Sequence, residues 1–295
     1  MYVVMGATGH VGSACVAALR REGRPVLAVV RDRARAESLE AMGAEIAVVA
    51  EVTNVDALRE TLRRGRRAFL LNPPAAPSTD TDRRERAGVE AILAALEGSG
   101  LEKVVVESTM GAQAGERLGD LSVLWALEEG VRRQPIPAAV NRGAYYLSNF
   151  DLQLEEIRTT GRLHTPFPAE FELPMAAPQD LGEFAARRLV SSLDDVDVVE
   201  IEGPTRPTFG AVAQAFGAAL GRSVEVATTP RHALVAAFEA QGFSAEEAEA
   251  YARMTAITLE GIGPTRSETE KGEIAMETYV HALVAGRAEA GRGAG

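Results

Sequence analysis

The amino-acid sequence predicts an α/β fold, with a doubly wound parallel sheet in the first half of the chain and a smaller, mostly helical region after it. Two observations lead to this prediction. Short runs rich in Val, Ile, Leu and Phe alternate with longer stretches of helical spacing, and a glycine-rich turn follows the first of these runs. Near-continuous apolar strands joined by helix-length crossovers are typical of a parallel sheet that is covered on both faces.

The apolar runs predict the strands of residues 1–150, which we expect to form the dinucleotide-binding domain. The runs are 2–5, 25–30, 44–49, 67–72, 103–108 and 136–141. The helical patterns between them cover 12–22, 34–42, 55–64, 82–99 and 121–133. Because crossovers between parallel strands are right-handed, this alternation winds helices onto both faces of one sheet.

Residues 151–285 are expected to form the smaller substrate-binding region. A polar, proline-rich passage interrupts the alternation, and segments near 179–202 then supply a helix and a strand that return to the sheet. Asp180 is expected to cap that helix. The remainder reads as a helical tail that contains Lys271, whereas residues 286–295 lack an apolar pattern and are expected to be disordered.

Composition places the protein among the globular proteins of the cytoplasm. Of its 295 residues, 46% are hydrophobic and 25% are charged, and no apolar run is long enough for a membrane helix. The net charge of −11 argues against binding of nucleic acid or of an anionic membrane, since both need a basic face. The single cysteine, Cys15, excludes an internal disulfide, and the histidines lack the spacing of zinc ligands.

The glycine-rich turn lies between the first strand and the first helix, in the sequence VMGATGHVGSACV. Gly6 allows a tight turn, Gly9 lets a pyrophosphate approach the backbone, and Gly12 lets the helix pack closely on the strand. The free N–H groups and the positive dipole of the helix start attract phosphate. The pattern predicts a Rossmann-type dinucleotide site, although a plain tight turn would use glycine in the same way. The other loop residues expected to line the site are Thr8, His10 and Val11.

The residues after the second predicted strand favour NADP(H) over NAD(H). An acidic residue at this point would hydrogen-bond the ribose diol of NAD. Here Arg31 follows the strand and Arg35 lies four residues further on, and guanidinium groups can pair with the 2′-phosphate of NADP. Asp32 could still serve the diol, so NAD(H) stays an alternative. Both arginines could also be solvated surface charges.

The glycine spacing G-x-x-G-x-x-G resembles that of extended and atypical short-chain dehydrogenase/reductases. Further stretches resemble the NmrA-like family in their order and spacing: VVRDRAR, AFLLNPP, VVVESTMGA, NRGAYYLSNF and LPMAAPQDLGEFAARRL. The resemblance spans roughly residues 1–205. It implies a Rossmann fold and a function among the NADPH-dependent quinone and azo-dye reductases, the isoflavone-reductase-like enzymes, or the redox sensors that bind the cofactor without turnover.

The resemblance also implies roles for residues at the ends of the predicted strands. Asn72 and Pro73 follow the fourth strand, where the family holds the cofactor ribose beside the mouth of the cleft. Ser108 and Thr109 end the fifth strand, where the family lines the nicotinamide, and Met110 comes next. Ligands of such sheets bind beyond the carboxyl ends of the strands, which agrees with these positions, although ordinary loop chemistry would also explain them.

The Tyr-x-x-x-Lys pair of many short-chain dehydrogenases is absent from this chain. In those enzymes the tyrosine is the acid and base, and the lysine lowers its pKa. The catalytic residues are therefore unknown, and the candidates are Tyr145 and Tyr146, which follow the sixth strand. A quinone, azo or imine acceptor can instead take a hydride directly while solvent supplies the proton.

Such a small hydrophobic acceptor needs an apolar cleft with a few polar points. The side chains expected to line it are Met110, Trp125, Tyr145, Tyr146, Asn149, Phe150, His164 and Phe167. Core packing is the alternative for Trp125 and Phe150, and a surface loop is the alternative for His164. The runner-up function is a redox sensor that binds NADP(H) without turnover. The protein is expected to be a monomer or a homodimer.

Overall fold

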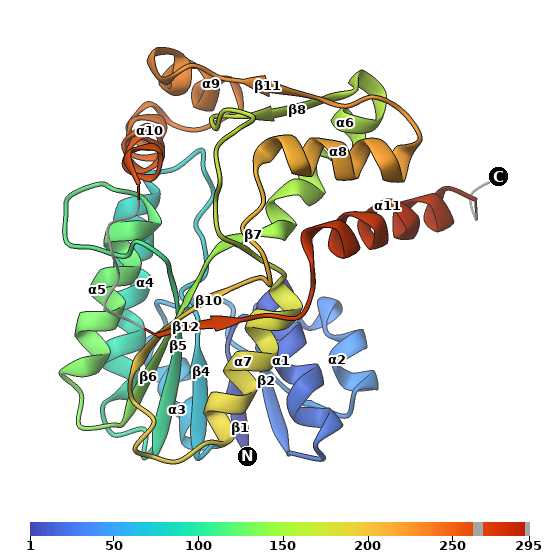
Figure 1. Ribbon diagram of the computed structural model, residues 1–295. Coiled ribbons are helices and arrows are strands. Elements are labelled where there is room, and N and C mark those ends of the chain that lie inside the picture. Colours follow the sequence, from blue (N-terminus) through green and yellow to red (C-terminus); the bar gives the residue numbers. More distant parts are fainter. Residues whose placement is uncertain (262–267, 293–295) are drawn as a thin grey trace.

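The computed structural model describes residues 1–261 and 268–292, and in this part of the chain eight parallel strands form one sheet (Figure 1). The strand order is β12-β10-β6-β5-β4-β1-β2-β3. The strands are β1 (Tyr2–Val4), β2 (Val26–Val30), β3 (Glu45–Val48), β4 (Arg67–Leu70), β5 (Lys103–Thr109), β6 (Ala138–Gly143), β10 (Val198–Glu202) and β12 (Glu268–Lys271). The predicted doubly wound parallel sheet is confirmed.

Helices cover both faces of the sheet (Figure 1). Helices α1 (His10–Arg21), α2 (Glu37–Ala41) and α7 (Pro178–Val190) lie on one face, and α3 (Val55–Arg63), α4 (Thr81–Leu96) and α5 (Asp120–Arg132) lie on the other. Helices α1 and α7 pack so closely that a Cβ at Gly182 would lie 2.4 Å from the Cβ of Ala14. This contact fixes the direction of α1, whose first turn carries the glycine loop.

The smaller region lies over the carboxyl ends of the strands (Figure 1). Its helices are α6 (Leu154–Thr160), α8 (Phe209–Leu220), α9 (Leu234–Ala240), α10 (Ala245–Glu260) and α11 (Met276–Arg292). Its short strands are β7 (Tyr145–Tyr146), β8 (Arg162–Thr165), β9 (Met175–Ala176) and β11 (Glu225–Thr228), and a 3-10 helix covers Leu147–Gln153. The region has an apolar core of its own, in which Phe167 stacks on Phe209 with 4.8 Å between the ring centroids.

The outer strand β12 was not expected. Its sequence ETEK is polar and each of its residues is exposed, so it lacks the apolar pattern of a buried strand. It pairs in parallel with β10, and the Lys271 ammonium pairs with the buried carboxylate of Glu202. The prediction that Lys271 lies in a helical tail is therefore wrong.

The helices of the second half differ from the prediction in two places. Asp180 lies within the first turn of α7 and does not cap it; its Oδ2 accepts a hydrogen bond from the N–H of Ile274 at 3.0 Å. Helix α11 continues to Arg292, so residues 286–292 are helical where disorder was expected, and residues 293–295 lie outside the described part. Across the described helices, none is both long and apolar enough to cross a membrane.

A buried polar network closes the amino edge of the sheet. The ammonium of Lys103, fully buried at the start of β5, donates to Ser191 Oγ at 2.8 Å and also faces Asp195. Arg188 of α7 donates to the same carboxylate. Burial raises the pKa of Asp195, but the hydrogen bonds from Arg188 and Ser191 outweigh it and hold this pKa at about 2. Lys103 thus serves the fold, at the edge opposite the glycine loop.

Candidate functional site

The glycine loop begins directly after β1, near the centre of the sheet. Gly6 has a φ of 61°, in the left-handed region that side chains disfavour. A Cβ at Gly12 would lie 2.2 Å from the carbonyl oxygen of Gly6, whereas a Cβ at Gly9 would lie 3.3 Å from that atom. The loop backbone is therefore folded tightly onto the first turn of α1, and only glycine fits at position 12.

The start of α1 offers free backbone donors. Within residues 1–261 and 268–292, the N–H groups of Thr8, His10, Val11 and Gly12 donate to no protein acceptor. Gly9 is the N-cap and supplies no side chain to satisfy them. The side chain of Val11 packs in the core, whereas His10 is exposed. Free N–H groups at the positive end of the α1 dipole fit a pyrophosphate.

Two exposed arginines follow β2. In the described part of the chain, the guanidinium groups of Arg31 and Arg35 make no hydrogen bond and no ion pair, and only the backbone N–H of Arg35 is engaged, by the Asp32 carbonyl. Between them, Asp32 Oδ1 accepts a hydrogen bond from the N–H of Ala34 at 2.9 Å and caps a short 3-10 helix, Arg33–Arg35. The Asp32 carboxylate is thus engaged in its own turn, which leaves the two guanidinium groups as the charged groups ready to meet a phosphate.

Asn72 lies just after β4, and its side chain points toward helix α4. Its Nδ2 donates to the carbonyl of Glu85 at 3.1 Å, and a Cβ at Gly88 would lie 2.6 Å from its Oδ1. Glu85 Oε1 accepts a hydrogen bond from the N–H of Ala75 at 2.9 Å. Helix α4 therefore pins the loop that contains the half-buried Pro73. The Asn72 side chain holds this loop, and its contact with the cofactor ribose stays a prediction.

Ser108, on β5, belongs to a buried network under α5. Its hydroxyl donates to Glu128 Oε1 at 2.5 Å, and Arg142 of β6 donates to the two carboxylate oxygens of Glu128 at 2.9 and 2.8 Å. The Ser108 hydroxyl is therefore already engaged by Glu128, and its contact with the nicotinamide stays a prediction. Thr109 is half-buried at the end of the strand, and Met110 packs in the core on the α1 side.

The expected aromatic walls lie largely in the core of the smaller region. Phe150 is fully buried and Phe167 is 5% exposed, so core packing accounts for both rings. Tyr145 is half-buried against them, and Asn149 is exposed. Burial raises the pKa of the Tyr145 phenol to about 12, although a hydrogen bond with Asn149 acts in the opposite direction.

Trp125 and the two predicted histidines occupy separate places. Trp125 is half-buried on α5. His164 is exposed on β8, with its Nε2 3.5 Å from the Glu156 carboxylate, which agrees with the alternative of a surface histidine. His10 Nε2, in the glycine loop, lies 3.9 Å from the carboxylate of Asp151 in the 3-10 helix after β7. The smaller region thus reaches the glycine loop at His10.

Glu107, which sequence reasoning missed, lies next to Ser108 on β5 and faces the α1 side. Tyr146 OH donates to its Oε1 at 2.9 Å. Burial raises the pKa of Glu107 to about 8, although the Tyr146 hydrogen bond opposes this shift. Burial and the Glu107 charge together raise the pKa of the Cys15 thiol on α1. An acid within an otherwise apolar buried strand is the sequence signal that could have found Glu107.

A second group of acids, also missed, lies between α4, α5 and α10. Glu247 of α10 is fully buried, and neither of its carboxylate oxygens has a partner among the described residues. Burial and the charge of Asp120 raise the pKa of Glu85 to about 8, and burial and the charge of Glu247 raise that of Asp120. No set of three or more His, Cys, Asp or Glu in the described chain could hold a metal ion. These acids favour proton sharing where α10 packs on the sheet domain.

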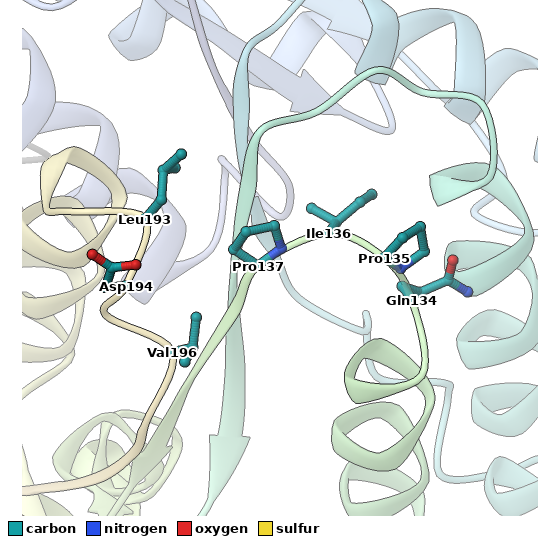
Figure 2. Close-up of a pocket in the computed structure, with 7 residues that line it drawn as sticks. All are labelled: Gln134, Pro135, Ile136, Pro137, Leu193, Asp194 and Val196. Atoms are coloured by element: carbon teal, nitrogen blue, oxygen red, sulfur yellow. The ribbon is translucent and has the colours of Figure 1, made fainter.

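Two surface depressions lie at the amino edge of the sheet. One depression of about 410 Å³ is open to solvent (Figure 2). Its lining residues are Gln134, Pro135, Ile136, Pro137, Leu193, Asp194 and Val196. Another, of about 250 Å³, lies beside the starts of β1 and β4. Both are at the opposite edge of the sheet from the glycine loop, so neither adjoins the free N–H groups at the start of α1.

The family model decides the relationship that the motifs suggested. The model of the NmrA-like family matches residues 2–267. The chain belongs to the NmrA-like family. The match extends beyond residue 205, where the resemblance visible in the motifs ended, and it includes α8, α9 and α10. The family predicted from the sequence is confirmed.

Several reductases are similar to this NmrA-like chain. The NAD(P)H azoreductase of Xenophilus azovorans is 24% identical over 230 residues, which are 76% of this chain and 75% of that protein. The structure of the triphenylmethane reductase of Citrobacter sp. has a TM-score of 0.79 at 16% identity. The NADPH-dependent quinone oxidoreductase of Escherichia coli, solved with NADPH, has a TM-score of 0.76 at 18% identity. Each structural match covers 96% of this chain and 99% of the other, and it shows a shared fold.

Proposed function

We propose that this NmrA-like protein is an oxidoreductase that uses NADPH to reduce a small hydrophobic acceptor of the quinone, azo or imine type. The observation that carries the proposal is the geometry of the glycine loop. Among the described residues, the N–H groups at the start of α1 have no protein acceptor, and Gly12 lies tightly against the Gly6 carbonyl. The names of the azoreductase and the quinone oxidoreductase support both the nicotinamide cofactor and the acceptor class.

The cofactor would lie along the carboxyl edge of the sheet, as ligands of doubly wound sheets do. The backbone of residues 8–12 would bind the pyrophosphate, and Arg31 and Arg35 would bind the 2′-phosphate. Pro73 follows β4, and Thr109 is the last residue of β5. Both would lie on the path toward the nicotinamide. Bound NADPH supplies a hydride, and the protein positions the acceptor beside it.

The positions of the lysines support direct hydride transfer without a tyrosine–lysine pair. Lys103 is buried at the amino edge of the sheet, and Lys271 pairs with Glu202 on the outer strands. Lys103 therefore lies at the opposite edge from Tyr145 and Tyr146, and the Lys271 ammonium is already paired with a carboxylate. The favoured acceptor is therefore one that can take a hydride without the acid catalysis that a simple ketone needs.

The test is acceptor-dependent oxidation of NADPH by the purified full chain. Loss of nicotinamide absorbance is followed with a panel of quinones, an azo dye, a cyclic imine and a simple ketone. We expect oxidation with at least one of the first three classes and none with the ketone. Tight binding of NADPH without oxidation by any acceptor would overturn the reductase proposal and favour a redox sensor.

Replacing Arg31 by alanine is expected to weaken NADPH binding and leave NADH binding nearly unchanged. A charge-assisted hydrogen bond contributes about 1.5–3 kcal/mol, which corresponds to roughly 10- to 100-fold in the dissociation constant. Calorimetric titration with both cofactors measures the ratio. Arg33→Ala is the matched control, because Arg33 lies in the same segment but pairs with Glu40 at 2.7 Å. Equal losses for NADPH and NADH in Arg31→Ala would contradict a 2′-phosphate contact.

A further inference from the structure

We propose that Tyr146 and Glu107 form a proton-donating pair for the acceptor, an inference that rests on the proposed reductase function. Tyr146 OH lies 2.9 Å from Glu107 Oε1, and the phenol is half-buried whereas the carboxyl is only 3% exposed. The pair thus joins a tyrosine that is partly exposed as a residue to an interior acid. This is the order that a proton relay requires.

The pair lies at the carboxyl edge of the sheet, on the same face as the glycine loop. Tyr146 lies on β7, shortly after the end of β6, and packs against the core under α1 and α7. A Cβ at Gly143 would lie 2.9 Å from a Tyr146 ring carbon and 3.1 Å from Glu107 Oε1, so glycine makes room for the contact. The nicotinamide half of a dinucleotide reaches this edge from the start of α1. The phenol is therefore on the cofactor's path.

Glu107 has the surroundings of a neutral acid. Within the described residues its Oε2 is buried and has no hydrogen-bond partner, and no cation pairs with the carboxyl. A buried carboxylate with one unsatisfied oxygen is costly, so the protonated form is favoured. The other titratable groups that face the pair are Cys15 of α1 and Asp120 of α5, and neither supplies a positive charge. Glu107 therefore carries a proton at neutral pH.

An acceptor that has taken a hydride holds an extra electron pair on its oxygen or nitrogen and needs one proton. Tyr146 Oη donates that proton, the Tyr146–Glu107 hydrogen bond reverses, and the Glu107 carboxyl returns a proton to the phenolate oxygen. The carboxylate left behind regains a proton from water after the product leaves. The pair thus selects neutral acceptors, such as quinones and imines, whose reduced forms need a proton.

The test compares two acceptors in the full chain with bound NADPH. A neutral quinone needs a proton after hydride transfer, whereas a cationic triarylmethyl dye becomes neutral by hydride transfer alone. Tyr146→Phe is expected to slow quinone reduction on the order of 10²-fold, the usual contribution of a general acid, and to leave dye reduction within about twofold. Unimpaired dye reduction also shows that the variant is folded and binds NADPH.

Glu107→Gln supplies a second readout, because glutamine keeps a hydrogen-bond acceptor for Tyr146 but has no acidic proton. In the wild type, the rate with quinone is expected to fall as pH rises through about 8, where Glu107 loses its proton. In Glu107→Gln, the rate is expected to be low and to lose this dependence. Tyr2→Phe is the matched control for Tyr146→Phe, because Tyr2 starts β1 at the amino edge of the sheet, opposite the glycine loop, and its rate with quinone is expected to stay that of the wild type.

The outcomes separate the pair from the reductase function. Selective loss with the quinone supports the pair. Equal slowing of both acceptors, or no slowing of either, overturns the pair while the reductase function stands. If the wild type oxidises NADPH with neither acceptor, the proposed function fails and the pair fails with it.

Discussion

Replacing Gly12 by alanine is expected to reduce NADPH affinity on the order of 10²-fold or more. The new Cβ would lie 2.2 Å from the Gly6 carbonyl oxygen and 3.0 Å from the Ala7 Cα, both of which are backbone atoms. Neither can yield as a flexible side chain would, so the loop must move away from α1. Overpacking of this kind costs about 1–3 kcal/mol, and the donors that would hold the pyrophosphate move with the loop.

Calorimetric titration with NADPH measures this effect, and far-ultraviolet circular dichroism verifies the fold. Gly286→Ala is the control, since a Cβ at Gly286 on α11 meets no atom within 4 Å. We expect unchanged affinity in the control. A folded Gly12→Ala variant that binds NADPH as tightly as the wild type would place the pyrophosphate elsewhere.

Replacing Glu128 by alanine is expected to lower the free energy of unfolding by about 3–5 kcal/mol, the usual cost of breaking a buried ion pair from one side. Glu128 is fully buried and binds the Arg142 guanidinium through both oxygens, and it also accepts from Ser108. Without the carboxylate, the half-buried Arg142 keeps its charge and the Ser108 hydroxyl loses its partner. The loss therefore exceeds that of a surface ion pair.

Urea denaturation measures the free energy of unfolding of Glu128→Ala, and Glu129→Ala is the control variant. Glu129 is the next residue on α5 and pairs with Arg132 at 2.6 Å near the surface. Exposed pairs of this kind contribute less than about 1 kcal/mol. Equal changes in the two variants would mean that the buried network under α5 does not stabilise the sheet.

The sheet was predictable because its signals are local. Apolar runs such as Val26–Val30 are buried throughout, and the glycine turn marks where β1 gives way to α1. Strand β12 carries no such signal. Its exposed residues give no apolar alternation, and its place depends on pairing with β10 and on the contact between Lys271 and Glu202. The local sequence does not predict long-range contacts of this kind.

The candidate site was predictable where backbone determines it. Gly6 and Gly12 have a conformation and a close contact that only glycine satisfies, so their pattern shows in the sequence. Side chains at the strand ends were harder, because neighbouring residues of a strand face opposite sides of the sheet. Ser108 consequently turns to Glu128 under α5, and Glu107 turns to Tyr146 on the α1 side.

The sequence also did not predict whether the phenylalanine rings of the smaller region line a cleft or fill its core. Phe150 and Phe167 could line a cleft or fill a core, and the choice depends on Phe209, which approaches them from α8, 59 residues after Phe150 and 42 after Phe167. The sequence around either ring contains no sign of this partner. Tyr146 combines partial exposure with a carboxyl partner at the sheet edge.

The most direct test of the reductase function follows the hydride itself. NADPH deuterated at C4 of the nicotinamide is oxidised by the wild-type chain in the presence of a cyclic imine or a cationic triarylmethyl dye, and the product is analysed by mass spectrometry. Direct transfer predicts deuterium on the reduced carbon of the product, with faster turnover from NADPH than from NADH. Product that carries no deuterium, or bound NADPH that no acceptor oxidises, would contradict it.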